Sequence, residues 1–211
     1  MSPSDRAIRP VVTVFESYGS GAEQVGRRVA AALGVAFHAQ AFSSEQLEEP
    51  PEQRDDQGLL ARVFAAMGGS YAALEGPAVP MVQRDEHELV LRNTRWVMDA
   101  ARAGGVIVGR NGAVILADWP GALHVRLDAP VSWRVEQAAR SGGISPARAA
   151  KRQRREDAVR ADMSLRLYGW DPREPTRYDL VLNTGSLGVD GCADIIVHAG
   201  RVKAERTAPA S

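Results

Sequence analysis

The sequence predicts a single α/β domain in which helices flank a mainly parallel, doubly wound sheet. Short apolar, β-branched runs alternate with longer amphipathic segments, and a glycine turn joins the first such run to the first helix. The chain has 211 residues, of which 45% are hydrophobic and 25% charged, as expected for a domain that buries a core. Because parallel strands need crossover connections, this alternation favours one sheet covered by helices on both faces.

Five apolar runs have the length and composition of buried parallel strands. The first, residues 11–15, reads Val-Val-Thr-Val-Phe and leads directly into the glycine turn. The second is residues 35–38, after Gly34, which ends the first helix. The others are residues 106–109, 122–127 and 179–182.

Helical periodicity predicts the segments between and after these strands. We expect helices over residues 22–33, 57–66, 85–103, 131–141 and 147–168, and a closing helix around 193–197. Proline and glycine interrupt residues 43–95, which we interpret as an arm over a ligand or as a poorly packed loop. The polar ends, residues 1–9 and 201–211, are expected to be flexible, which leaves residues 10–200 as the domain.

Charge and cysteine content exclude several classes of function. The 26 basic and 26 acidic residues balance, so no overall field attracts the chain to nucleic acid or to a membrane. Basic residues concentrate between Arg134 and Arg177, which suits a small polyanion such as a nucleotide. The single cysteine, Cys192, and four scattered histidines predict neither a disulfide nor a metal cluster. Since no signal peptide or membrane-spanning run is present, we expect a cytoplasmic protein; its oligomeric state stays open.

The glycine turn is the first candidate site. Gly19-Ser20-Gly21 lies between a buried strand and a helix, where backbone N–H groups and the positive helix end attract an anion. The same pattern also serves as a plain tight turn, so the motif alone leaves both interpretations open.

Further segments resemble, in order, the cytidylate-kinase-like family of nucleoside monophosphate kinases. The resemblance spans roughly residues 11–197. It is carried by the loop from Glu16 to Gly21, Val108 to Asn111, Val125 to Pro130, the Asp-x-x-Arg pair Asp157 and Arg160, and the stretch from Tyr178 to Gly188.

This resemblance implies a fold, an activity and cofactors. The fold would be P-loop NTPase-like, with a helical segment at about 43–95 covering the acceptor and an arginine-rich lid at about 142–177. The activity would be transfer of the γ-phosphoryl group of ATP to a nucleoside monophosphate or related small acceptor, with Mg²⁺ between the phosphates.

The resemblance also assigns roles to individual residues. Arg110 and Asn111 would bind the acceptor, although Arg110 also suits an ordinary surface arginine. In the lid, the catalytic candidates are Arg155, Asp157 and Arg160, and the alternative is a solvated basic helix. Helical spacing places residues 148, 152 and 155 on one face and 157 and 160 on another. The nucleotide would be held by Gly19, Ser20, Gly21, Ala22, Glu23, Gln24 and Arg152.

Three departures set this sequence apart from the pattern. Ala22, Glu23 and Gln24 follow Gly21, so the lysine and the metal-binding hydroxyl of a Walker A loop are missing. Ala39 and Asn111 replace acidic residues of the resembled family. Two alternatives therefore stay open: a weak or inactive nucleotide-binding protein, and a kinase for an unrelated hydroxyl-bearing molecule.

Overall fold

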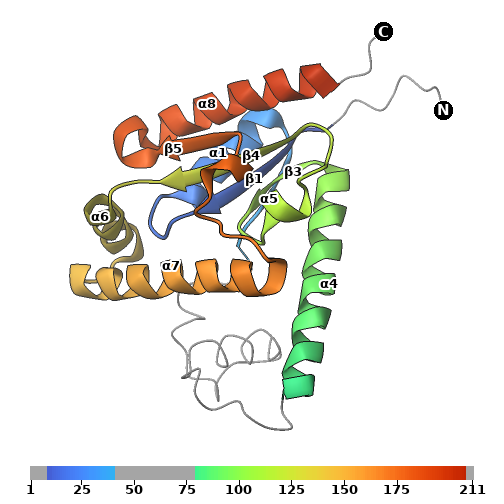
Figure 1. Ribbon diagram of the computed structural model, residues 1–211. Helices are drawn as coiled ribbons and strands as arrows, with labels where there is room; N and C mark the ends of the chain where they lie inside the picture. Colours follow the sequence, from blue (N-terminus) through green and yellow to red (C-terminus); the bar gives the residue numbers. More distant parts are fainter. Residues whose placement is uncertain (1–8, 41–78, 208–211) are drawn as a thin grey trace, which may run out of the picture.

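The computed structural model describes residues 9–40 and 79–207 (Figure 1). Within these ranges, five parallel strands form one sheet in the order β2-β3-β1-β4-β5. The strands are β1 (Val11–Glu16), β2 (Ala36–His38), β3 (Gly105–Val108), β4 (Ala122–Asp128) and β5 (Leu180–Asn183).

The first strand of the chain occupies the centre of the sheet. β1 pairs with β3, where Val11 faces Gly105, and with β4, where Val11 faces Ala122. The chain therefore builds outward from β1 in both directions, first to β2 and β3 and then to β4 and β5. In such sheets, ligands bind beyond the carboxyl ends of the strands where the direction of winding changes, which here is the end of β1.

Helices cover both faces of the sheet. α1 (Ala22–Leu33) and α8 (Thr184–Thr207, kinked at Gly188) pack together on one face, and α4 (Val79–Ala103) and α5 (Gly112–Ile115) lie on the other. α6 (Val131–Gly142) and α7 (Pro146–Tyr168) pack on each other, and α7 passes below the sheet in Figure 1. A short 3₁₀ turn, Pro175–Arg177, leads into β5.

Burial follows this layering. The larger core lies between the sheet and α1 and α8, where Val14, Val25 and Ile196 are buried. The smaller core lies under α4, around Val97 and Ile107. The inner strands are apolar on both faces because helices cover both, as the sequence pattern predicts.

The predicted α/β class and parallel sheet are confirmed, and each predicted strand is present within two residues at either end. The closing helix is longer than expected: residues 201–207, which we assigned to a flexible tail, form the last turns of α8. The predicted helix at 57–66 lies outside the described residues, as do residues 1–8 and 208–211. No helix in the described ranges combines the length and hydrophobicity needed to cross a membrane.

Candidate functional site

Two cavities meet at the carboxyl end of β1. The first, of about 460 Å³, lies beside the glycine turn and the start of α1, and we call it the loop cavity. The second, of about 350 Å³, lies between the ends of β1 and β3 and the helices α4 and α7, and we call it the arginine cavity because Arg92, Arg110 and Arg160 line it. Of the described residues lining the two cavities, Glu16 alone belongs to both.

The glycine turn has a backbone that only glycine adopts easily. Gly19 and Gly21 have φ angles of 81° and 80°, in the left-handed region that side chains disfavour. A Cβ on Gly19 would lie 2.4 Å from the carbonyl oxygen of Arg134, so the turn packs directly against the backbone of α6. The glycines at 19 and 21 thus fix a close-packed turn at the start of α1.

The Glu16 carboxylate folds back over the turn that it begins. Its Oε2 accepts a hydrogen bond of 3.1 Å from the backbone N–H of Ala22, in the first turn of α1. Its Oε1 accepts from the side-chain amide of Gln40 and lies 3.4 Å from Nη2 of Arg160. A carboxylate at a helix N-terminus is favourable, because it neutralises the exposed N–H groups and the positive end of the helix dipole.

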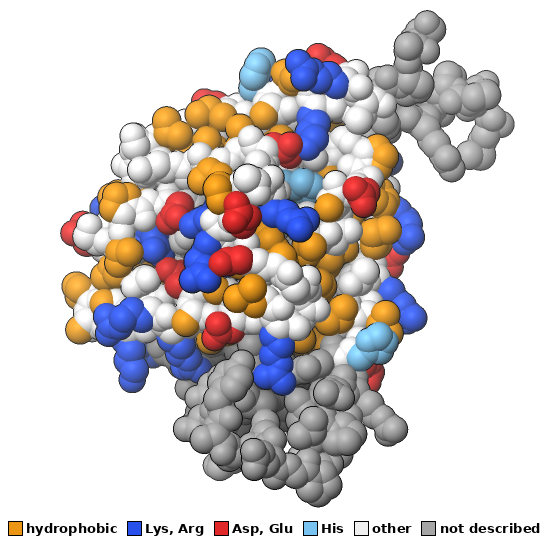
Figure 2. Space-filling view, viewed as in Figure 1, with side chains coloured by type: hydrophobic (Ala, Val, Ile, Leu, Met, Phe, Trp, Pro, Cys, Tyr) orange, Lys and Arg blue, Asp and Glu red, His pale blue; other side chains and the backbone are white. Residues whose placement is uncertain are grey.

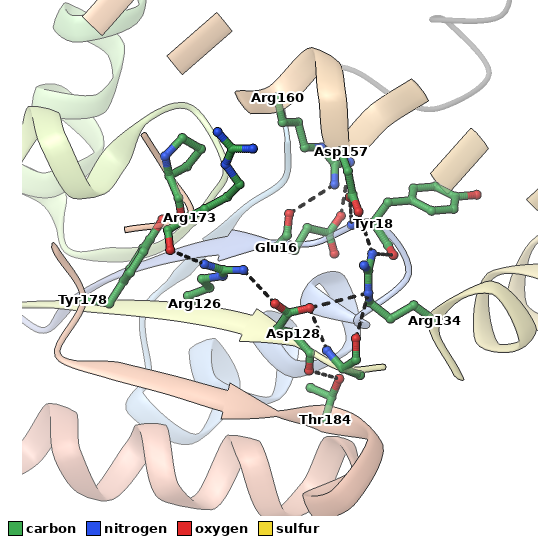
Figure 3. Close-up of polar contacts among 12 residues, drawn as sticks. Glu16, Tyr18, Arg126, Asp128, Arg134, Asp157, Arg160, Arg173, Tyr178 and Thr184 are labelled. Atoms are coloured by element: carbon green, nitrogen blue, oxygen red, sulfur yellow. Dashed lines mark hydrogen bonds and ion pairs between the residues drawn. The ribbon is translucent and has the colours of Figure 1, made fainter. Parts of the chain in front are cut away.

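The glycine turn is also tied to α6 and α7 by a partly buried ion pair (Figure 3). Asp157 of α7 accepts hydrogen bonds from the backbone N–H of Tyr18, at 2.8 Å, and from Arg134, at 2.9 Å. Arg134 in turn donates to the carbonyl oxygen of Tyr18 at 2.9 Å. Asp157 and Arg134 therefore hold both backbone polar groups of Tyr18, and they position the backbone of the turn.

Arg134 is held in place from the end of β4. Its side chain is only 6% exposed, and it donates from Nε to the carbonyl oxygen of Ala129 at 3.0 Å and lies 3.5 Å from the carboxylate of Asp128. Asp128 also pairs with Arg126 at 2.7 Å (Figure 3). A buried arginine with this many acceptors is fixed in one orientation, which suits a positioning role.

The arginine cavity begins with an unusual backbone at the end of β3. Gly109, Arg110 and Asn111 all have positive φ angles, of 70°, 58° and 57°. For residues other than glycine this conformation costs on the order of 1 kcal/mol or more each, and it persists where surrounding contacts enforce it. Such strain is concentrated at functional sites, so it marks Arg110 and Asn111 as candidates.

Arg110 stacks on an aromatic ring in the wall of this cavity. Its guanidinium carbon lies 3.8 Å from the ring centre of Trp96, and its Nε donates to the carbonyl oxygen of Ala39 at 3.3 Å. Burial lowers the pKa of Arg110 from its usual value, although a guanidinium stays charged at neutral pH. The stack orients the planar group, and planar cations of this kind grip phosphate oxygens in pairs.

Hydrogen bonds join the strained turn to α4 and α7. The side-chain oxygen of Asn111 accepts from Ser164 at 2.7 Å and from the indole N–H of Trp170 at 2.9 Å. The side-chain amide of Asn93 donates to the carbonyl oxygen of Arg110 and to the hydroxyl oxygen of Tyr168. Burial raises the pKa of Tyr168, and the hydrogen bonds from α4 oppose this only in part. These contacts fix the direction in which Arg110 leaves the backbone.

Arg160 lines the arginine cavity and contacts Glu16, the residue that lines both cavities. Besides the Glu16 carboxylate, it contacts the Glu16 carbonyl oxygen at 3.3 Å, Gln40 at 3.1 Å and Glu156 at 2.8 Å. Its side chain is 19% exposed, so it is partly shielded while lining the arginine cavity. Arg160 thus connects α7 to the end of β1.

The structure brings most of the predicted site residues together. Six of the seven nucleotide-side candidates, all but Ser20, line the loop cavity, and Ser20 is fully buried. Arg110, Asn111 and Arg160 line the arginine cavity. Asp157 lines neither cavity and instead holds the turn, as described above.

Arg155 departs from the predicted helix face. Arg152 and Glu156 point inward from α7, whereas Arg148 and Arg155 are exposed and line neither cavity. The inward face of α7 therefore follows the spacing 152, 156 and 160 and not 148, 152 and 155, because the helix packs on α6 and the turn. Figure 2 shows basic side chains along the edge of the molecule where α7 begins.

Sequence reasoning missed several residues of this site. Glu16 was interpreted only as the first residue of the loop, yet its position directly before a glycine turn was a usable signal. Arg92, Asn93 and Trp96 lie on α4 and face the arginine cavity. Their helical spacing placed them on one face, but nothing in the sequence showed that this face meets a cavity.

Comparison with known proteins gives several similar chains. A cytidylate kinase of Ignicoccus hospitalis is 27% identical over 190 residues, covering 88% of this chain and 96% of that one. A cytidylate kinase of Methanopyrus kandleri is 26% identical over 212 residues, covering 96% and 99%. A uronate isomerase of Corynebacterium glutamicum is 41% identical over 110 residues, but the match spans 52% of this chain and only 21% of that protein.

Solved structures include one with the same fold. An uncharacterized protein from Eubacterium ventriosum superposes with a TM-score of 0.64 at 18% identity, covering 92% of this chain and 99% of that one. The model of the cytidylate kinase-like family matches residues 11–186. This range includes the glycine turn, the strained turn after β3 and the described residues that line the two cavities. This chain belongs to the cytidylate kinase-like family.

Proposed function

We propose that this protein transfers the γ-phosphoryl group of ATP to a nucleoside monophosphate. The loop cavity holds the triphosphate end of ATP, and the arginine cavity holds the acceptor. One observation supports this most strongly: the two cavities meet at Glu16, at the carboxyl end of the central strand, so ligands in them would face each other. Phosphoryl transfer requires little beyond such alignment and charge stabilisation.

The charges that line the arginine cavity favour the binding of an acceptor that carries phosphate. Among its described lining residues, three arginines face one carboxylate, that of Glu16. Arg110 is oriented by its stack on Trp96, and Arg92 lies on the neighbouring helix α4. Two guanidinium groups on adjacent walls can hold one phosphate group from two sides.

The rest of the arginine cavity supports a base-bearing acceptor. Its walls are mostly apolar and include the aromatic side chains of Phe15, Trp96 and Tyr168. Flat aromatic and apolar walls with a few polar groups suit a nucleobase, which is planar and presents hydrogen-bonding edges.

The loop cavity supports a polyphosphate held mainly by backbone groups. Gly19 and Gly21 allow a ligand to approach the backbone closely, and the N-terminus of α1 points its N–H groups toward the cavity. Arg152 and Arg27 line the same cavity and supply the cations that the missing Walker lysine does not.

The residues of the site also fit Mg²⁺, which prefers oxygen ligands and binds through one or two carboxylates together with nucleotide phosphates. The Glu16 carboxylate lies where the cavities meet and is 13% exposed, so it is the residue that would hold the ion. Bound there, Mg²⁺ would neutralise charge on the transferred phosphoryl group.

A coupled assay of ADP formation tests the proposal. ATP and Mg²⁺ are supplied with each common nucleoside monophosphate in turn, and we expect turnover with one acceptor or one small group of acceptors. Calorimetric binding of ADP is measured in parallel. Nucleotide binding without turnover on any acceptor would contradict phosphoryl transfer and favour a nucleotide-binding protein.

A further inference from the structure

Glu16 occupies a position that a phosphate-binding loop ordinarily leaves to glycine. In the pattern Gly-x-x-x-x-Gly-Lys, the second glycine corresponds to Gly21, so the first corresponds to Glu16 and the lysine to Ala22. A glycine at the first position leaves the space over the loop open. Here a carboxylate fills part of it.

The carboxylate takes up a donor that the phosphates of a nucleotide would use. Backbone N–H groups at the start of the helix cradle the phosphates in such loops. In this structure the N–H of Ala22 donates to Oε2 of Glu16 at 3.1 Å. A nucleotide that enters the loop cavity must therefore displace this carboxylate or lie against it.

Residues 16–24 themselves carry no cation; the cations beside this carboxylate are Arg160, at 3.4 Å, and Arg152, which lines the same cavity. Ala22 and Glu23 supply neither the lysine nor the hydroxyl of a Walker loop. Arg27, which lines the loop cavity, is 61% exposed and pairs with Glu23 at 2.8 Å. A metal-free nucleotide would place several negative charges beside Glu16, and this repulsion weakens binding steeply at contact distance.

A divalent cation reverses this interaction. Carboxylate oxygens are ligands that Mg²⁺ accepts, and the ion commonly bridges a protein carboxylate and nucleotide phosphates. The carboxylate that repels a free nucleotide would then attract a metal–nucleotide complex. Gln40 and Arg160 remain beside Glu16 and steady the side chain in either case.

We propose that Glu16 makes the loop cavity selective for a metal–nucleotide complex over the metal-free nucleotide. This inference rests on the proposed function, because it takes the loop cavity as the nucleotide site. Glu16 is then a specificity-determining residue for the donor, and it replaces with one carboxylate the metal-binding role of the missing hydroxyl.

Titration calorimetry with ADP tests this proposal without relying on turnover. ADP is titrated into the wild-type protein once in the presence of excess Mg²⁺ and once in the presence of EDTA. We expect the affinity for ADP to be at least about tenfold higher with Mg²⁺. In Glu16→Gln, whose amide oxygen still accepts from the Ala22 N–H, binding without metal should strengthen by about tenfold and the Mg²⁺ effect should nearly vanish.

Glu136→Gln is the matched control, because Glu136 is an exposed carboxylate of α6 that lines neither cavity. Its affinity for ADP should change by less than about twofold in either condition. Equal wild-type affinities with Mg²⁺ and EDTA would overturn the proposal even if Glu16→Gln fails to fold. ADP binding in neither condition would instead overturn the nucleotide site itself.

Discussion

The two cavities that share Glu16 are built in opposite ways. The loop cavity is shaped by backbone: two left-handed glycines, the first turn of α1 and the backbone of Tyr18, which Arg134 and Asp157 clamp. The arginine cavity is shaped by side chains, with Arg110 stacked on Trp96. Under the proposed function, a backbone site of this kind would accept the phosphate chain of any metal-bound nucleotide, whereas the side chains of the arginine cavity would select the acceptor.

Gly19→Ala is expected to have the largest effect, since it attacks the backbone of the loop cavity. The left-handed φ costs about 1–2 kcal/mol and the contact of 2.4 Å with the Arg134 carbonyl oxygen about 1–3 kcal/mol more. Chemical denaturation should show the loss in free energy of unfolding, and ADP binding should fall with it.

Gly34→Ala provides the matched control for this variant. Gly34 also has a left-handed φ, of 66°, but no atom lies within 4 Å of the added Cβ. It should lose only about 1–2 kcal/mol and keep ADP binding. Equal losses in both variants would mean that the contact between the glycine turn and α6 does not shape the loop cavity.

Arg110→Ala should lower the affinity of the arginine cavity for the acceptor and leave the affinity of the loop cavity for ADP unchanged. Loss of a charged hydrogen-bonding partner costs about 1.5–3 kcal/mol, or about 10- to 100-fold in affinity for the monophosphate acceptor. Calorimetry with the acceptor and with ADP separates the two cavities. Arg95→Ala removes an exposed arginine of α4 that lines neither cavity and should change both affinities by less than about twofold. An unchanged acceptor affinity in Arg110→Ala would refute the assignment.

Acid should lower the stability of the fold beside the arginine cavity through His38. The ring of His38 packs edge-on against Trp96, which lines this cavity. Burial and the nearby Arg110 lower the pKa of His38 below 6.5. The unfolded chain then binds a proton at higher pH than the folded one, so stability is full above about pH 6.5 and falls as pH drops through the folded pKa. Because the ring is partly exposed, we expect less than about 1 kcal/mol.

His38→Phe keeps a ring against Trp96 and should remove this part of the pH dependence. Thermal unfolding, measured at several pH values between neutral and mildly acidic, follows the change in stability. His87→Phe, at an exposed histidine of α4, should retain the wild-type profile. If the two variants and the wild type lose stability in parallel, the proton is taken up elsewhere.

Short sequence patterns predicted the helices and strands whose formation depends mainly on neighbouring residues. β1, α1 and the turn between them followed from an apolar run, two glycines and a helical period, and the structure confirms all three. The end of α8 was missed because a polar, charged composition resembles a flexible tail even where the helix continues to Thr207.

Long-range contacts explain what the sequence concealed in the site. From the sequence alone, Arg134 resembles an exposed arginine on a helix surface. In the structure its partners are Tyr18, Asp128 and Asp157, which belong to three other segments. Arg155 was grouped with Arg152 by helical spacing, and only the packing of α7 decides which of the two faces inward. Such choices depend on tertiary contacts that no local pattern encodes.

The clamp on the glycine turn also determines when the loop cavity can form during synthesis. The turn lies near the start of the chain, yet its supports are Arg134 and Asp157, which are more than one hundred residues further on. β1 itself has no strand partner until β3 and β4 are made. β1 and its turn are translated before their supports and are thus shaped late, so under the proposed function a ribosome-bound chain that ends before α7 would gain no stabilisation from ATP.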